Sequence, residues 1–424
     1  MIAGRLRRPS RALAAILLAA ALSRFVFAGW VVGFGAAPRG DETDYHAIAT
    51  NLAAGEGFVS FEGFPTARRP PAYPVFLSAL YRATGPVTGA GRLAQVLLGV
   101  VVVWLTVRVT SRWFGDRAGR VAGALAAVNP FLVFISGYLL TENLYLVFVL
   151  SALAVTASPP GFSASRKRAA AAGVLLGLAA LTRPSGLPLF EWVLAAALVA
   201  GGGAWRRRLA PVALAALAFA AVVFPWYARN AEVAGGWVLT THGGITFYQG
   251  NNARVVDTPQ WRGGAAPLEA LPRFDEMAGK SELERDRLAW QLGRDYLRHQ
   301  WRDIPSLVGW KLVRFWRVRS DMGLSGIRSG WWFGKDSALG RLAASVDVGM
   351  AYALVVLPLF VAGLVTTRRR WRELGFAHGI VVVHTAVAVV FFGSLRTRIP
   401  VEPVMCAFAG AVLVALAGRL RPAR

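Results

Sequence analysis

"ALAAILLAAALSRFVFAGWVVGF", residues 12–34, is an almost entirely apolar segment in which Arg24 is the one charged residue. A transmembrane helix needs about 20 predominantly apolar residues. The stretch meets that length and exceeds the apolar core of a secretory signal, so we interpret it as an uncleaved membrane span. Arg24 then either snorkels toward the membrane interface or has a partner inside a helical bundle.

Similar segments recur along the chain and predict a polytopic membrane protein. The 424 residues are 55% hydrophobic and 17% charged, which is too apolar for a soluble protein of this length. The expected fold class is all-α, a bundle of about ten transmembrane helices. The nine spans predicted after the first are 93–111, 120–138, 143–157, 169–182, 186–202, 210–227, 346–366, 375–393 and 400–418.

The basic residues predict the topology of these spans. A net charge of +24 would suggest a nucleic-acid partner in a soluble protein. Here the Lys and Arg residues form short clusters between apolar segments, which is typical of cytoplasmic loops, so no nucleic acid is expected. All dense clusters share one face if both termini are cytoplasmic. These clusters lie at 112–120, 166–168, 206–208, 368–372 and 419–424.

The opposite, extracytoplasmic face then receives two long segments. One is a first loop at 36–90, within an N-terminal transmembrane module that covers 1–228. The other is 229–345, which we expect to be a small extracytoplasmic subdomain before a C-terminal transmembrane module at 346–424. Apolar spacing in this subdomain predicts an amphipathic helix over 281–299. Alternating Trp and basic residues predict an interfacial helix over 304–319.

Acidic and basic groups meet on this outer face. A guanidinium binds phosphate through charge-assisted hydrogen bonds, and a carboxylate can deprotonate a hydroxyl or hold a divalent cation. Together they suit a reaction with a phosphate leaving group and a hydroxyl nucleophile. The alternative is that they are solvated loop charges that cap helices and pair with each other. The groups are Asp41, Glu42, Asp44, Glu142, Arg68, Arg69, Arg183, Arg229, Arg396 and Arg398.

The stretch "GGITFYQGNN", residues 243–252, has two interpretations. Its Asn251 and Asn252 can bind sugar hydroxyls. Gly and Asn are also the usual turn formers, and we favour a turn.

Six motifs in order resemble the GT-C glycosyltransferases, specifically the bacterial relatives of dolichyl-phosphate-mannose protein mannosyltransferase and lipid A aminoarabinose transferase. The first loop carries Asp41-Glu42, then Tyr45, "GEGF" at 55–58 and "RPPAYP" at 69–74. Each motif is moderately specific, and together they cover most of residues 40–403. The later motifs are "TENLY" from Thr141, "GLAALTRPSGL" from Gly177, "FPWYARN" from Phe224, "GGITFYQGNN" from Gly243 and "RTRIPVEP" from Arg396.

The resemblance implies a GT-C-like bundle that moves a sugar from a polyprenyl-phosphate donor to an acceptor hydroxyl outside the cytoplasm, with inversion. It implies Asp41 as the general base, supported by Glu42, although Asp44 is a rival for that role. The donor phosphate would be bound by Arg69, Arg183, Arg229, Arg396 and Arg398. The substrate would be contacted by Tyr45, Tyr73, Glu142, Asn251 and Asn252. The resemblance leaves the cofactor open: a divalent ion, Mg or Mn, is one option, and Asp41 and Glu142 would then hold it.

The partners and location follow from the same resemblance. They are the lipid-linked donor, membrane lipids, and a lipid, glycan or protein acceptor, at a bacterial cytoplasmic (inner) membrane with the site facing the periplasm or cell exterior. The sugar and the acceptor are left open. The rival function is a transporter or flippase of lipid-linked sugars, but the charges gather at one face and no internal repeat is evident.

Overall fold

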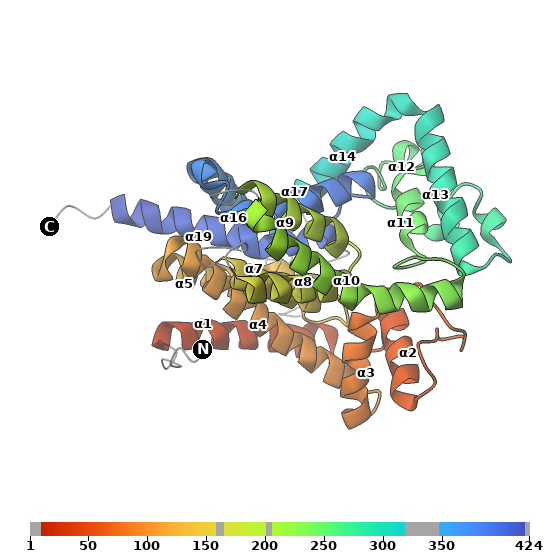
Figure 1. Ribbon diagram of the computed structural model, residues 1–424, viewed down its shortest axis with the longest axis horizontal. Helices are drawn as coiled ribbons and strands as arrows, with labels where there is room; N and C mark the ends of the chain where they lie inside the picture. The colour runs from red at the N-terminus through yellow and green to blue at the C-terminus, as the bar shows by residue number, and fades with distance from the viewer. Residues whose placement is uncertain (1–9, 158–164, 201–205, 319–346, 420–424) are drawn as a thin grey trace, which may run out of the picture.

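The structure is a computed structural model that describes residues 10–157, 165–200, 206–318 and 347–419. These residues form helices and loops without a β-strand, apart from an isolated antiparallel bridge between Val59 and Pro65. Figure 1 shows the long helices side by side in one bundle. The predicted all-α membrane fold is therefore confirmed. The two ends of the chain, residues 158–164 and 201–205, and residues 319–346 at the end of the predicted subdomain lie outside this description.

The bundle is built from helices that coincide with the predicted spans. Five of them are long and apolar enough to cross a membrane, by length and composition. Those five helical stretches are 11–32, 88–114, 208–234, 348–366 and 395–419. The helices are α1 (Arg11–Val26), η1 (Phe27–Val32), α4 (Thr88–Phe114), α5 (Asp116–Val128), α6 (Pro130–Ile135), α7 (Glu142–Thr156), α8 (Arg166–Ala180), α9 (Gly186–Ala200), α10 (Arg206–Ala234), α16 (Val348–Thr366), α17 (Gly375–Val390), α18 (Leu395–Arg398) and α19 (Glu402–Arg419).

One predicted span, 120–138, is broken into α5 and α6 at Asn129. The Asn129 side chain accepts hydrogen bonds from the backbone N–H groups of Phe131 and Leu132 and so caps α6. Pro130 stands at the first position of α6, where its missing N–H is not needed. The break frees the last carbonyl groups of α5, which need hydrogen-bond donors inside the bundle.

Arg24 supplies those donors. Its fully buried guanidinium donates to the carbonyl oxygens of Ala126 at 3.1 Å and Ala127 at 3.0 Å. The cation therefore caps the C-terminal end of α5, which carries a partial negative charge. Of the two interpretations of Arg24, the partner inside the bundle is the correct one.

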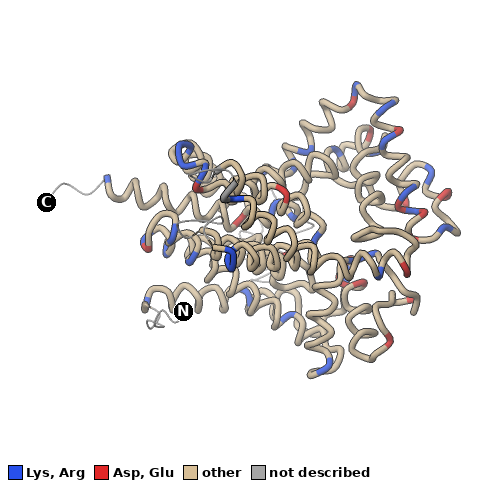
Figure 2. Tube along the Cα trace, in the orientation of Figure 1, with Lys and Arg blue, Asp and Glu red and all other residues tan. Residues whose placement is uncertain are grey.

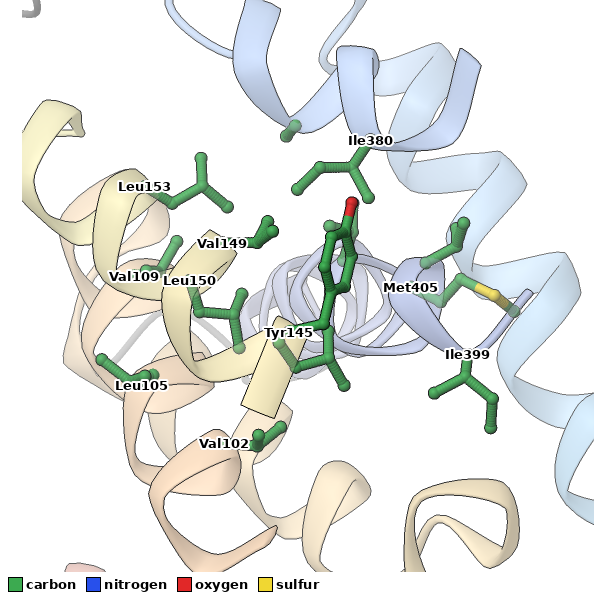
Figure 3. Close-up of a cluster of buried hydrophobic side chains, with 14 of the residues drawn as sticks. Val102, Leu105, Val109, Tyr145, Val149, Leu150, Leu153, Ile380, Ile399 and Met405 are labelled. Atoms are coloured by element: carbon green, nitrogen blue, oxygen red, sulfur yellow. The ribbon is translucent and has the colours of Figure 1, made fainter. Parts of the chain in front are cut away.

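The core of the bundle is a continuous apolar cluster that joins early and late helices. Figure 3 shows Tyr145 of α7 between Val149 on its own helix, Ile380 of α17 and Met405 of α19. The Tyr145 hydroxyl lies 3.1 Å from Nε2 of the buried His384, so the polar tip of this aromatic ring is satisfied. Tyr145 lies in the first turn of α7, so this packing holds the start of α7, where Glu142 stands, against α17 and α19.

Two groups of short helices stand at one end of the bundle (Figure 1), and α1 begins and α19 ends at the opposite end. The first group is α2 (Asp41–Ala54) and α3 (Ala72–Thr84). The second group contains α11 (Gly243–Gly250), α12 (Ala253–Asp257), α13 (Glu282–His299) and α14 (Ile304–Trp316), with short turns η3 (Leu268–Ala270), η4 (Phe274–Met277) and η5 (Trp301–Asp303). We call this second group the α11–α14 region. The remaining short turns are η7 (Arg368–Arg370) and η8 (Ile399–Val401).

The α11–α14 region confirms one predicted element and corrects another. The predicted helix over 281–299 is α13, which begins with a capping box between Ser281 and Glu284. The turn predicted for 243–252 is wrong, because residues 243–250 form α11. Gly244 is needed for packing there: its N–H donates to the Asp286 carboxylate at 2.7 Å, and a Cβ at this position would lie 2.0 Å from the Asp286 carbonyl oxygen.

Candidate active site

Five chain segments bring charged side chains together at the end of the bundle that carries α2, and one of them is the stretch before α3 that contains Arg69. Asp41 is the first residue of α2, and Glu142 is the first residue of α7. Arg396 lies on the short helix α18, and Arg183 lies in the corner between α8 and α9. Carboxylates at helix N-termini are favoured by the helix dipole, so their position follows from local folding. Figure 2 shows that acidic and basic residues mix at this end, whereas Lys and Arg predominate where α19 ends.

The central group is Asp41, whose carboxylate lies between two guanidinium groups. Its Oδ1 accepts a hydrogen bond from Nη2 of Arg69 at 2.6 Å, and its Oδ2 accepts one from Nη1 of Arg396 at 2.5 Å. Its side chain is 31% exposed, so it remains open to a ligand. Burial would raise the pKa of Asp41, but Arg396 and Arg69 outweigh burial and hold this pKa well below its usual range. Asp41 is therefore an ionised carboxylate near neutral pH.

Each of the two arginines has a second carboxylate as an anchor. Nε of Arg69 donates to Oδ2 of Asp44 at 2.9 Å. Nε of Arg396 donates to Oε1 of Glu142 at 2.6 Å, and Nη1 of Arg183 contacts the same oxygen at 2.7 Å. The side chains thus form a continuous row of alternating charge, which we call the charge ladder. In order it consists of Asp44, Arg69, Asp41, Arg396, Glu142 and Arg183.

A guanidinium group stands at each end of the charge ladder: Arg183 is its last member, and Arg68 lies next to its first member, Asp44. Arg183 donates to the Thr141 hydroxyl at 3.0 Å through the nitrogen that contacts Glu142, and among the described residues its Nε and Nη2 have no partner. Arg68 lies 3.5 Å from Asp44, and its side chain is 43% exposed. The ladder thus keeps guanidinium donors that an added anion can use.

Tyr45 packs against Arg69 of the charge ladder, and Tyr73 packs against Tyr45. The guanidinium of Arg69 lies over the Tyr45 ring, 5.2 Å from its centroid, and Tyr45 packs edge-on against Tyr73. Tyr73 is fully buried, and its hydroxyl accepts a hydrogen bond from Gln95. The structure therefore brings Tyr45 to the ladder as a platform, whereas Tyr73 lies in the core beneath it.

Glu42 faces away from the ladder. Its buried carboxylate accepts a hydrogen bond from the Leu139 N–H at 2.7 Å and from the Arg39 N–H at 3.2 Å, and it lies 3.6 Å from Nη2 of Arg92. These contacts tie the start of α2 to the corner before α7. Glu42 therefore positions Asp41 and Glu142 relative to each other, and it does not contact the Asp41 carboxylate itself.

Arg229 and Arg398 lie apart from the charge ladder. Arg229 donates to the backbone carbonyl oxygens of Thr66 at 2.6 Å and Phe58 at 3.1 Å, so it holds the segment that leads to Arg68. Arg398 is buried in the bundle, where its Nε donates to Glu402 at 2.9 Å. Neither side chain touches a ladder residue among the contacts of the described chain.

Asn251 and Asn252 are buried and bind the backbone. Asn251 donates to the carbonyl oxygens of Phe247 and Val390, and its Oδ1 accepts a hydrogen bond from Nζ of Lys311 at 2.7 Å. Asn252 donates to the Tyr248 carbonyl oxygen and caps α12. Asn251 therefore connects the end of α11 to α14 and to the end of α17. Asn252 connects α11 to α12.

Glu282 is a residue of this area that the sequence did not single out. Its carboxylate accepts hydrogen bonds from Thr66 Oγ1 at 2.6 Å, from the Ala67 N–H at 3.0 Å and from Thr241 Oγ1 at 2.8 Å. It thereby fastens the segment before Arg68 to the start of α11. The sequence signal was its place after Ser281 at the start of a predicted helix, which shows a first-turn acid but none of its distant partners.

The predicted metal ligands are arranged around an arginine. The described residues contain no group of three or more His, Cys, Asp or Glu side chains that could hold a metal ion. Asp41 and Glu142 both bind Arg396, so a guanidinium lies where a shared cation would have to lie. The side chains as arranged do not fit a divalent cation between them.

Comparison with known proteins agrees with this architecture. Residues 68–228 match the family model described as dolichyl-phosphate-mannose-protein mannosyltransferase. ArnT from Cupriavidus metallidurans, solved with undecaprenyl phosphate, matches with a TM-score of 0.57 at 17% identity over 97% of this chain and 62% of ArnT. The archaeal oligosaccharyltransferase AglB from Archaeoglobus fulgidus, solved with an inhibitory peptide and a dolichol-phosphate, matches with a TM-score of 0.51 at 13% identity, over 97% of this chain and 52% of AglB.

The chain therefore spans about three fifths of the length of ArnT and about half of that of AglB. No curated protein matches the sequence significantly. At these identities the two structures establish the fold, and the family model adds a match over residues 68–228. The chain is thus an integral membrane protein with the GT-C fold that resembles the dolichyl-phosphate-mannose-protein mannosyltransferases, as its motifs predicted.

Proposed function

We propose that this protein is a glycosyltransferase that moves a sugar from a polyprenyl-phosphate donor to an acceptor hydroxyl. The observation that carries the proposal is the Asp41 carboxylate held between the guanidinium groups of Arg69 and Arg396. A carboxylate that can take a proton stands directly beside cations that can bind a phosphate. ArnT was solved with undecaprenyl phosphate and AglB with a dolichol-phosphate, which supports the same class of donor here.

In the proposed reaction the acceptor oxygen attacks the anomeric carbon of the donor sugar. Asp41 takes the proton of the acceptor hydroxyl as the new C–O bond forms. The bond from the anomeric carbon to the phosphate oxygen breaks at the same time, and its electron pair leaves with the polyprenyl phosphate. Attack from the face opposite the leaving group inverts the configuration. The guanidinium groups stabilise the charge that develops on the phosphate.

The two anchored arginines suit that phosphate role. Arg69 and Arg396 reach Asp41 through Nη atoms, while their Nε atoms stay bound to Asp44 and Glu142. A donor phosphate that draws the Nη groups toward itself would weaken their hold on Asp41, whose pKa would then rise and make it a better base. Arg183, whose Nε and Nη2 have no partner within the described ranges, completes the phosphate site.

The geometry favours Asp41 over Asp44 as the base. Asp41 binds both arginines and touches both halves of the charge ladder, whereas Asp44 contacts Arg68 and Arg69 at one end. Asp44 is also less exposed, at 16% of its side chain against 31% for Asp41. We therefore assign Asp44 the task of positioning Arg69, and we assign Glu142 the corresponding task for Arg396.

We infer that the site faces the outside of a bacterial cytoplasmic membrane. The support is the positive-inside pattern of the basic clusters in the sequence, and Figure 2 shows that Lys and Arg predominate at the end of the bundle where α19 ends, away from α2. The acceptor would approach from the side of the α11–α14 region. AglB was solved with an inhibitory peptide, so peptide acceptors are to be tested beside lipid and glycan acceptors.

We infer that transfer requires no metal cofactor. The A. fulgidus oligosaccharyltransferase was solved in complex with Zn and sulfate. In this chain Arg396 already compensates the charges of Asp41 and Glu142, so no step of the reaction is routed through a metal ion.

The deciding experiment is transfer from radiolabelled polyprenyl-phosphate sugars to membrane acceptors in proteoliposomes. We expect the wild type to consume one donor and Asp41→Asn to lose about 10³-fold in rate, because a positioned base contributes about 10²–10⁴-fold. Asp44→Asn is the matched control and should lose about tenfold. Full activity of Asp41→Asn would refute the proposed base. A donor that crosses the bilayer unconsumed would support the transporter or flippase instead.

A further inference from the structure

The start of α11 is fastened to the segment that carries Arg68 and Arg69. The Thr241 N–H donates to the Ala67 carbonyl oxygen at 3.0 Å. The Glu282 carboxylate bridges the same two segments through the Ala67 N–H and the Thr241 hydroxyl. The residue after Thr241 is His242, so its position relative to the two arginines is fixed by backbone contacts.

His242 carries one ring nitrogen that is unsatisfied within the described part of the chain. Its Nδ1 atom is enclosed by protein and has no hydrogen-bond partner among the described residues. The ring as a whole remains partly exposed. A buried polar group without a partner costs about 1–3 kcal/mol, so such a group is usually retained for a ligand or for function. Three other histidines bind neighbours: His46 binds the Tyr81 hydroxyl, His299 the Asp295 carbonyl and His384 the Tyr145 hydroxyl.

The charges around His242 keep its ring neutral. Burial lowers the pKa of His242 to about 3, and the charges of Arg69 and Arg68 lower it as well, whereas Asp41 raises it. The imidazole therefore lies within electrostatic range of all three groups. The backbone contact between Thr241 and Ala67 places His242 beside the segment that carries Arg68 and Arg69.

We propose that His242 recognises the sugar of the lipid-linked donor by hydrogen bonding one of its hydroxyl groups. This inference rests on the proposed function, because it takes the phosphate to be bound by the arginines next to the ring. A neutral imidazole offers one donor and one acceptor, which is the pattern of a hydroxyl. A phosphate would bind the cationic guanidinium groups instead, since charge-assisted hydrogen bonds are stronger. The sugar directly follows the phosphate, so it reaches the ring beside Arg69.

The test measures how much the sugar adds to donor binding in the full-length protein in nanodiscs, without acceptor. The probes are undecaprenyl phosphate and the same lipid phosphate carrying mannose, glucose, galactose, arabinose or aminoarabinose. We expect one sugar to tighten binding by the wild type. In His242→Phe the Kd for the sugar-bearing lipid should rise about three- to tenfold, as expected for the loss of one hydrogen bond. Its Kd for undecaprenyl phosphate should change less than about twofold. His242→Asn or His242→Gln, whose amides reproduce one ring nitrogen each, should recover part of the gain.

His299→Phe is the matched control, because His299 is exposed on α13 and lies outside the site. The proposal is overturned if no sugar improves wild-type binding or if His242→Phe keeps the full gain. It is also overturned if His242→Phe weakens undecaprenyl phosphate as much as the sugar-bearing lipid, which would indicate a structural or phosphate role. A wild type that binds the sugar-bearing lipid but never transfers the sugar would refute the proposed enzyme alone, and the effect of His242 on binding would still stand.

Discussion

Two arginines of α18, Arg396 and Arg398, have nearly the same sequence context and opposite surroundings. Arg396 is 34% exposed along its side chain and is shared by Asp41 and Glu142. Arg398 is 1% exposed, pairs with Glu402 at 2.9 Å and donates to the Arg317 carbonyl oxygen at 2.9 Å. Residues two apart on a helix point about 200° away from each other. One arginine therefore reaches the charge ladder and the other enters the bundle.

Under the proposed function, the difference separates a charge held for a ligand from a charge held for the fold. Arg396 keeps part of its surface open, and one of its two carboxylate partners, Asp41, is also 31% exposed. Glu402 accepts a second hydrogen bond from Asn129 at 2.9 Å, where α5 breaks into α6, so the Arg398 pair connects three parts of the bundle. Substitution at one position should affect transfer and substitution at the other should affect folding.

The largest effect is expected from Arg396→Gln. This change removes the cation between Asp41 and Glu142 and a donor to the leaving phosphate, so transfer should fall about 10²–10³-fold. The thermal unfolding temperature in detergent should change by only a few degrees, because Arg396 is partly exposed. Arg398→Gln should show the reverse: a large loss of thermal stability, with the transfer rate per folded molecule within about threefold of wild type. If both variants lost transfer to the same extent at equal stability, the separation of roles would be wrong.

Glu402→Gln addresses the buried pair from the other side. It leaves the Arg398 charge without compensation in the bundle, which should destabilise the protein by about 3–5 kcal/mol, measured as loss of folded protein on heating. The double variant Arg398→Met with Glu402→Leu should recover much of this loss, since an apolar pair of similar volume needs no compensation. A double variant less stable than Glu402→Gln would show that the hydrogen bonds to Asn129 and Arg317 dominate.

The sequence predicted the bundle and the central residues of the site, because apolar length and charge clusters depend on local composition. Asp41, Asp44, Glu142, Arg183 and Arg396 were all chosen from motifs near span ends, and the structure brings them together. The direction of each side chain could not be predicted in this way. Glu42 follows Asp41 directly but points to Leu139 and Arg92, because neighbouring residues of a helix lie about 100° apart.

Long-range partners were also beyond the sequence. The glycines of 243–252 suggested a turn, but the close contact between Gly244 and Asp286 shows that small size serves helix packing there. Glu282 and His242 are separated from Arg68 by more than 170 residues, so no local pattern could relate them. A burial pattern within one helix also could not show that Asn251 binds Lys311.

Lys311 provides a smaller test, of the joint between the α11–α14 region and α17. Its ammonium donates to Asn251 Oδ1 and to the Val389 carbonyl oxygen at 3.0 Å, and burial lowers the pKa of Lys311 to about 7. The folded protein then binds fewer protons than the unfolded chain between pH 7 and about 10.5. Stability contributed by Lys311 should be complete above that range and lost as the pH falls toward 7.

The measurement is thermal unfolding of wild type and Lys311→Met at pH 7.5 and 9.5. The free energy of unfolding of the wild type should gain up to about 1.4 kcal/mol per pH unit relative to the variant. Lys311→Met removes the titrating group, so its own slope should be flatter. If the free energy of unfolding changed equally with pH in the two proteins, the three oxygen acceptors near Nζ would be shown to keep Lys311 charged throughout this pH range.

The smallest effect is expected from removal of divalent cations. Transfer in proteoliposomes treated with EDTA should stay within about twofold of the untreated rate, because Arg396 already lies between the carboxylates that would share a cation. Arg396→Gln sharpens this test. Without the guanidinium, Asp41 and Glu142 become a pair of uncompensated carboxylates, which favours a hard cation with oxygen ligands. Added Mg or Mn should then partly restore transfer by the variant and leave the wild type unchanged. Loss of wild-type activity in EDTA, with recovery on adding either ion, would show that these carboxylates bind a metal in the working enzyme and that Arg396 must move to admit it.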